Sequence, residues 1–142
     1  MAQSKAIALP ATVAGILELD TWTEANARLL DLGERQVESL RVCAAEAATN
    51  IVTHAMAGRD DGIFEVQLHV NGGARLVFLD DGPAFDPTAV PDPPRATSIQ
   101  DAPLGGLGIR LIRGFARSMS YRRTAGRNEL TLLFDPTSPE GR

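Results

Sequence analysis

The most regular hydrophobic pattern in the chain lies between Glu34 and Met56. Alanine is frequent in this stretch, and it contains neither proline nor glycine. Apolar residues recur every three or four positions, at Val37, Leu40, Ala44, Ala47 and Ile51. This spacing predicts one long helix with a single buried stripe.

Two polar residues of that helix are placed unusually. Glu46 and Asn50 each lie one position before an apolar residue of the stripe. They therefore form a second stripe beside the first, one helical turn apart. An acid and an amide at the rim of a core do not improve packing, so their placement indicates a cleft.

The chain before this helix contains two further elements. Lys5–Leu9 is a short apolar run closed by proline and is interpreted as a strand. The pattern of Ala11–Leu19 fits a strand or a helix, and both alternatives stay open. Thr21–Leu32 is predicted to be a helix, because Thr21 and Glu24 have capping-box spacing and Gly33 can end it.

Two hairpins are predicted after the long helix. Ile63–Val70 alternates apolar and polar residues, as a half-buried strand does, and Asn71-Gly72-Gly73 is a hairpin turn that leads into Ala74–Leu79. Met119–Arg123 and Glu129–Phe134 flank a turn at Ala125-Gly126 and form the second hairpin.

A long irregular segment separates the hairpins. Pro83–Pro103 holds six of the nine prolines, lacks apolar periodicity and spans about 20 residues, a length typical of lids or binding loops. A glycine-rich turn, Leu104–Ile109, follows it, and Arg110–Ser118 is predicted to be a helix. The domain is expected to span residues 5–134, with residues 83–105 as a lid and with flexible tails at 1–4 and 135–142.

These elements define the fold class α+β. Two or three helices should cover one face of a mixed, mostly antiparallel sheet in a two-layer α/β sandwich. The 142 residues suffice for one domain with its own core.

Composition narrows the function further. The net charge of −4 argues against general nucleic-acid binding. Arginines gather late in the chain, either as a face for a phosphate or an acidic partner or simply as a solvated helix face. The single cysteine, Cys43, is interpreted as a small core residue. No apolar run reaches the ~18 residues of a membrane span and no signal core is evident, so a cytoplasmic protein is expected.

The glycine-rich turn is the first candidate for chemistry. Gly105, Gly106 and Gly108 let the backbone approach a ligand, and the N–H groups and dipole of the following helix favour an anion such as phosphate. The alternative is a plain connection. The spacing is neither that of a dinucleotide fingerprint nor that of a P-loop.

Asp80 and Gly82, at the end of a predicted strand, are the second candidate. A carboxylate there can accept a hydrogen bond from the exocyclic amino group of adenine, whereas guanine presents a carbonyl at the same edge. Gly82 leaves room for the base. The alternative is an ordinary Asp-Gly turn.

Glu46 and Asn50 are the third candidate. Mg²⁺ prefers oxygen ligands and shares them with phosphates and water, and the Asn50 side chain supplies one neutral oxygen. Glu46, one turn away, can accept a proton from a hydroxyl group that attacks a terminal phosphate. The alternative is a polar helix rim. His54, one turn further, is interpreted as a helix-end residue rather than a catalytic one.

The order and spacing of these motifs are more specific than any one of them. The segments EAATNIVTHA, DDGPAFDP, GGLGIRLIRGFA and GRNELTLLF together resemble the GHKL, or histidine kinase-like, ATPase family over residues 5 to 134. Within it they look most like the bacterial anti-sigma factor serine/threonine kinases. The resemblance implies a Bergerat-type ATP-binding fold with ATP and Mg²⁺ as cofactors.

The resemblance also implies roles for the first group of residues. Asn50 would bind Mg²⁺ and Glu46 would be the catalytic general base. Asp80 would bind the adenine amino group, with Gly82 beside it.

A second group of implied roles lies later in the chain. Gly106, Leu107 and Gly108 would lie against the phosphates at the end of the lid. Thr131 would supply a late-strand hydroxyl group that helps to hold the adenine edge. Similar proteins often carry a basic residue just before the lid glycines. This chain has Pro103-Leu104-Gly105 there. Arg95 or Arg110 are the candidate substitutes. Because the usual position holds no basic residue, the resemblance supports ATP binding more strongly than kinase activity.

The implied function is an anti-sigma factor and serine/threonine protein kinase. It would phosphorylate an anti-anti-sigma antagonist protein and sequester a sigma factor, without direct contact with nucleic acid or membrane. The alternative is a non-catalytic, adenine-nucleotide-binding interaction switch. A detached sensor histidine kinase domain is disfavoured because no dimerisation helix precedes the first strand. Homodimerisation is common among similar proteins, but no feature of this sequence establishes it.

Overall fold

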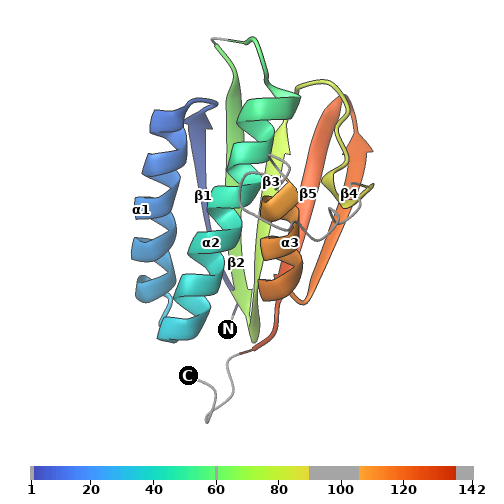
Figure 1. Ribbon diagram of the computed structural model, residues 1–142. Helices are drawn as coiled ribbons and strands as arrows, with labels where there is room; N and C mark the ends of the chain where they lie inside the picture. The colour runs from blue at the N-terminus through green and yellow to red at the C-terminus, as the bar shows by residue number, and fades with distance from the viewer. Residues whose placement is uncertain (1, 60, 90–105, 137–142) are drawn as a thin grey trace, which may run out of the picture.

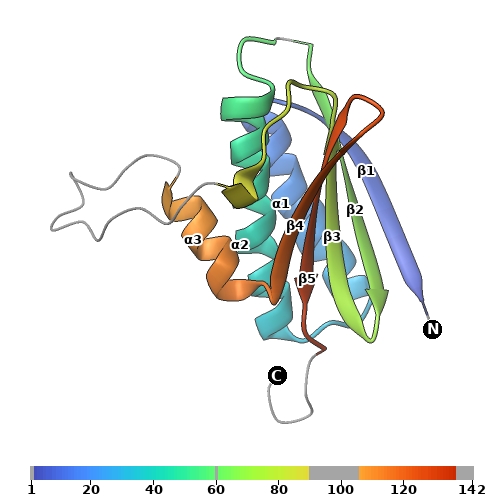
Figure 2. The same ribbon diagram turned by 90° about the vertical axis from the view of Figure 1, so that its right-hand side faces the viewer.

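The computed structural model describes residues 2–59, 61–89 and 106–136. Five strands form one sheet in the order β1-β2-β3-β5-β4, and three helices cover one of its faces (Figure 1, Figure 2). The strands are β1 (Gln3–Pro10), β2 (Ile63–Asn71), β3 (Gly73–Asp80), β4 (Ser118–Thr124) and β5 (Arg127–Phe134); the helices are α1 (Val13–Leu29), α2 (Glu34–Asn50) and α3 (Gly106–Phe115). The predicted two-layer α+β sandwich is confirmed. All four strand pairings are antiparallel, so the sheet is not mixed.

The first helix begins earlier than the sequence pattern predicted. Thr12 is its N-cap, and the Thr12 hydroxyl oxygen accepts a hydrogen bond from the Gly15 backbone N–H at 3.1 Å. Thr21 therefore lies inside α1, and the predicted capping box does not exist. The first strand also starts early. Gln3 and Ser4 pair with β2, so they belong to the sheet and not to a tail.

The long helix predicted over 34–56 is present but changes its geometry near the end. α2 ends at Asn50, and the next five residues, η1 (Ile51–Ala55), form a π-helical turn. The Met56 N–H closes this turn by donating to the Ile51 carbonyl at 2.7 Å. π-turns inside helices are rare and often accompany functional sites. Here the turn directly follows Asn50.

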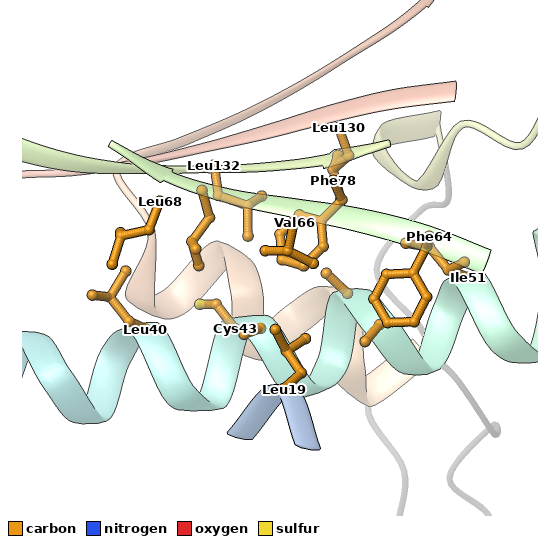
Figure 3. Packing of buried hydrophobic residues seen from close by; sticks show 14 of the residues in the cluster. Leu19, Leu40, Cys43, Ile51, Phe64, Val66, Leu68, Phe78, Leu130 and Leu132 are labelled. Atoms are coloured by element: carbon orange, nitrogen blue, oxygen red, sulfur yellow. The ribbon is translucent and has the colours of Figure 1, made fainter. Parts of the chain in front are cut away.

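The core lies between the helices and the sheet. Figure 3 shows Leu40 and Cys43 of α2 facing Leu68 of β2 and Leu132 of β5. All four side chains are buried, as is Leu19 of α1. Tight packing of α2 against the strands fixes where the polar residues of α2 can lie. Within the described part of the chain, no helix combines the length and the apolar character needed to cross a membrane.

The third helix starts at Gly106, four positions before the predicted start. It packs against α2. The glycine-rich turn is thus partly the first turn of α3, and its last residues lie against the helix that carries Glu46 and Asn50. Residues 90–105, most of the predicted lid, lie outside the described residues.

Candidate functional site

Asp80 ends β3 on the helix-covered side of the sheet and is buried. Its Oδ1 atom accepts two hydrogen bonds of 2.9 Å, one from the Gly82 backbone N–H and one from Asn128 Nδ2. The first bond closes the Asp-Gly turn, which the sequence analysis gave as the alternative to a role in adenine binding. The second ties the carboxylate to β5, so Asp80 takes part in more than a turn.

Asn50 and Asp80 line the same small cavity between α2 and the sheet. Both side chains are buried, with 5% and 4% of their surface exposed. Asn50 Nδ2 has no hydrogen-bond partner among the described residues. A buried donor without a partner is costly, by about 1–3 kcal/mol. The unpartnered Asn50 Nδ2 atom therefore fits a site in which a ligand or water completes the polar contacts.

Asn128 is the residue that sequence reasoning missed. It is buried at the start of β5, directly opposite Asp80 in the strand register. Its position follows from strand alternation: the core residues of β5 are Leu130, Leu132 and Phe134, and the same parity extends back to Asn128. A polar residue on the buried side of a strand is a signal that could have been recognised.

The segment after β3 closes the cavity. Phe85 lines it and stacks on His54 of η1, with ring centroids 4.9 Å apart. Pro87 and Tyr121 line it as well. The cavity measures about 20 Å³, room for roughly one water molecule and far less than a purine ring needs. A base can therefore enter only if some of the lining residues move, and Phe85 and Pro87, which lie outside the sheet, are candidates.

Glu46 lies on α2 where this helix meets α3, one residue before the cavity-lining Ala47. A Cβ atom added to Gly108 would come within 2.7 Å of Glu46 Oε1. Only glycine lets the first turn of α3 approach the carboxyl group this closely. Gly106 and Leu107 belong to the same first turn. The structure thus places the carboxyl group of Glu46 against Gly108 in the first turn of α3.

Two predicted contributions are not found at the cavity. Thr131 lies on β5 between the core residues Leu130 and Leu132, so strand alternation directs it to the opposite face of the sheet. Its predicted contact with the adenine edge is therefore not supported by this geometry. Arg95 lies outside the described residues, while Arg110 is on the exposed side of α3.

Cys43 has the structural role that was expected. Its side chain is fully buried in the core. Burial raises the pKa of the Cys43 thiol to about 12, and the nearby charge of Glu46 adds to this effect. A thiol with such a pKa is a poor nucleophile at neutral pH, because the reactive form is the thiolate.

The pattern of the histidine kinase-like ATPase domain matches residues 9–134, nearly the whole chain, and the chain belongs to this family.

Comparison with individual proteins agrees with this assignment. The chain is similar to the serine/threonine-protein kinase BtrW of Bordetella bronchiseptica, with 42% identity over 95 residues that are 66% of this chain and 67% of BtrW. The fold resembles the RsbU and RsbW domains of a Mycobacterium tuberculosis protein (TM-score 0.66, 14% identity) and the histidine kinase domain of a blue-light activated kinase from Erythrobacter litoralis (TM-score 0.52, 15% identity). The alignments cover 96% and 89% of this chain, but only 33% and 61% of those two chains.

Proposed function

We propose that this protein binds ATP with Mg²⁺ and acts as an anti-sigma factor serine/threonine kinase. It phosphorylates a small antagonist protein, sequesters a sigma factor in the cytoplasm and so regulates transcription. The observation that carries the proposal is one buried site. Asp80 and Asn50, from β3 and α2, line the same cavity, and Asn50 Nδ2 has no partner among the described residues.

The chemistry of the residues fits an adenine nucleotide. Asp80 is a buried carboxylate that can accept a hydrogen bond from the amino group of adenine, and it would repel the carbonyl group of guanine at the same edge. Asn50 offers an amide oxygen, a ligand type suited to Mg²⁺. Bound Mg²⁺ would neutralise phosphate charge. Gly106, Leu107 and Gly108 provide the first turn of a helix, where backbone N–H groups favour phosphate.

Glu46 is the proposed general base, which accepts a proton from the attacking hydroxyl group. Its carboxyl group lies against Gly108 at the start of α3, the end of the helix proposed for the phosphates. In the proposed reaction the hydroxyl oxygen of a Ser or Thr of the partner bonds to the terminal phosphorus of ATP. The bond from this phosphorus to the bridging oxygen of ADP breaks, and Glu46 accepts the hydroxyl proton. This requires that the partner's hydroxyl group reach the α2–α3 contact.

A second candidate is a nucleotide-dependent interaction switch without catalysis. The sequence favours it at one point, because no basic residue lies just before the lid glycines. Both candidates share the nucleotide site and differ only in phosphate transfer. The position of Glu46 against Gly108 supports the kinase, and so does the name of the relative BtrW, a serine/threonine-protein kinase.

The test is titration calorimetry with ATP, ADP and GTP, with and without Mg²⁺. We expect adenine-selective binding that Mg²⁺ strengthens. Asn50→Ala should remove the effect of Mg²⁺, and Asp80→Asn should weaken ATP binding by about 1–3 kcal/mol. The matched control is Asp81→Asn, because Asp81 is the adjacent carboxylate, is exposed and pairs with Arg59 at 3.1 Å. Unchanged ATP affinity in Asp80→Asn would remove Asp80 from the site.

The kinase and the switch are then separated by one more variant. Glu46→Gln should bind ATP as the wild type does but should no longer transfer labelled γ-phosphate to a purified antagonist protein. A wild-type protein that binds ATP and transfers no phosphate to any serine or threonine would favour the switch.

A further inference from the structure

Among the described residues, the Asn128 side chain joins several elements beside the cavity. Its Oδ1 atom accepts hydrogen bonds from the Phe85 N–H at 3.2 Å, from Arg123 at 3.0 Å and from the Tyr121 hydroxyl group. Its Nδ2 atom donates to Asp80 Oδ1 and to the Pro83 carbonyl, both at 2.9 Å.

The orientation of this amide follows from its partners. A carboxylate and a backbone carbonyl can only accept hydrogen bonds, so the atom facing Asp80 and Pro83 must be the nitrogen. A backbone N–H and a guanidinium group can only donate, so the atom facing Phe85 and Arg123 must be the oxygen. Reversing the amide would break all of these bonds at once.

Asn128 contacts the sheet on one side and the segment after β3 on the other. Asp80 and Asn128 are register partners on the hydrogen-bonded strands β3 and β5. The partners Pro83 and Phe85 instead belong to the segment after β3, which lies outside the sheet. The bond between Asn128 and Asp80 can therefore persist when the contacts to the segment are lost.

We infer that Asn128 is a positioning residue for base selectivity, which fixes the Asp80 carboxylate so that its second oxygen faces the base. This rests on the proposed function. Both hydrogen bonds that the described residues make to the Asp80 carboxylate end on Oδ1. A carboxylate accepts through two oxygens. Oδ2 is thus the atom left to accept the amino group of adenine, and Asn128 stops the carboxylate from rotating away.

The test compares ATP with purine riboside triphosphate, which lacks only the 6-amino group. The wild type should bind ATP at least about tenfold more tightly, the scale of one hydrogen bond to a charged group. In Asn128→Ala this advantage should fall to less than about threefold, while the affinity for the purine analogue stays nearly unchanged. A merely structural role would instead weaken both ligands by the same factor.

A second variant guards against misfolding. Asn128→Leu keeps roughly the volume and shape of the side chain but has no donor for Asp80, and thermal unfolding of both variants shows that they are folded. It should lose the advantage of ATP as Asn128→Ala does. The matched control is Glu129→Gln, on the same strand, where the side chain pairs with Arg122 at 2.9 Å on the far face. Glu129→Gln should keep the full advantage.

The outcomes separate this inference from the proposed function. Binding of ATP by both Asn128 variants with the wild-type advantage would overturn the positioning role and leave the nucleotide site intact. An equal loss of both ligands would also overturn it, in favour of a structural role. Failure of the wild type to bind either nucleotide would overturn the proposed function and this inference together.

Discussion

The contact between Gly108 and Glu46 allows a test of the proposed general base at the scale of one residue. In Gly108→Ala the new Cβ atom would lie 2.7 Å from Glu46 Oε1, the far end of a flexible side chain. The carboxyl group can move aside at little cost to folding. We expect thermal stability close to that of the wild type, with phosphate transfer reduced at least about tenfold because the base is displaced.

The matched control for this variant lies in the same helix. A Cβ atom at Gly114 would meet nothing within 4 Å. Gly114→Ala should therefore keep full activity and raise stability by about 0.5–1 kcal/mol through helix propensity. If Gly108→Ala transfers phosphate at the wild-type rate, Glu46 does not act from its observed position.

The structure brings only some of the candidate site residues together, and the reason is geometric. Glu46, Asn50 and Asp80 were identified because an unusual polar residue at a core rim or strand end is visible in the pattern. Thr131 and Asn128 depend on strand parity. Thr131 has the expected residue type but lies on the far face, whereas Asn128 shares the parity of the core residues. Knowing the residue type was not sufficient to place a side chain at the cavity, because strand parity decides which face of the sheet the side chain lies on.

At the scale of elements, an ion pair joins the first two helices. Arg41 of α2 donates to both carboxylate oxygens of Asp20 of α1, at 3.0 and 2.9 Å. The hydrogen bonds from Arg41 lower the pKa of Asp20, although burial opposes part of this effect. The pair stabilises the protein fully above the ordinary pKa of an aspartate, about 3.9, and the contribution is lost as the pH falls through the lower folded value.

Asp20→Asn should therefore destabilise the protein at pH 7 but hardly at all in acid. Both side chains are about one-third exposed, so solvent screening limits the loss at pH 7 to about 1 kcal/mol or less. Urea unfolding across the pH range in which the wild type stays folded measures the difference. Glu38→Gln is the control, since Glu38 is more exposed and lies 3.9 Å from Arg41. A difference that stays constant with falling pH would contradict this assignment.

Most elements could be predicted from the sequence, and the errors have local causes. Strands β2 and β3 followed from clear alternation and a glycine turn. The start of α1 was missed because Thr21 and Glu24 imitate a capping box, while Thr12 caps the helix without one. The π-turn after Asn50 was not predicted, because such turns are rare and the apolar spacing of this stretch fits a continuous α-helix.

The whole molecule contains one candidate reporter of nucleotide binding. Cys43, the sole cysteine, is buried where α2 packs on the sheet, and burial raises the pKa of its thiol to about 12. A thiol reagent should reach it only when the domain opens globally. The labelling rate then follows the free energy of unfolding when opening and closing are fast.

Ligand binding to the folded state should therefore slow the labelling of Cys43. At an ATP concentration 100 times its dissociation constant, the folded state gains about 2.7 kcal/mol, which corresponds to about 100-fold slower labelling. The same ATP concentration should have a much smaller effect on Asp80→Asn, which keeps Cys43 but binds ATP more weakly. If calorimetry shows ATP binding and the labelling rate does not change, then Cys43 is reached by local opening of α2. The part of α2 around Cys43 would then open while the nucleotide stays bound, although Cys43 is fully buried in the core.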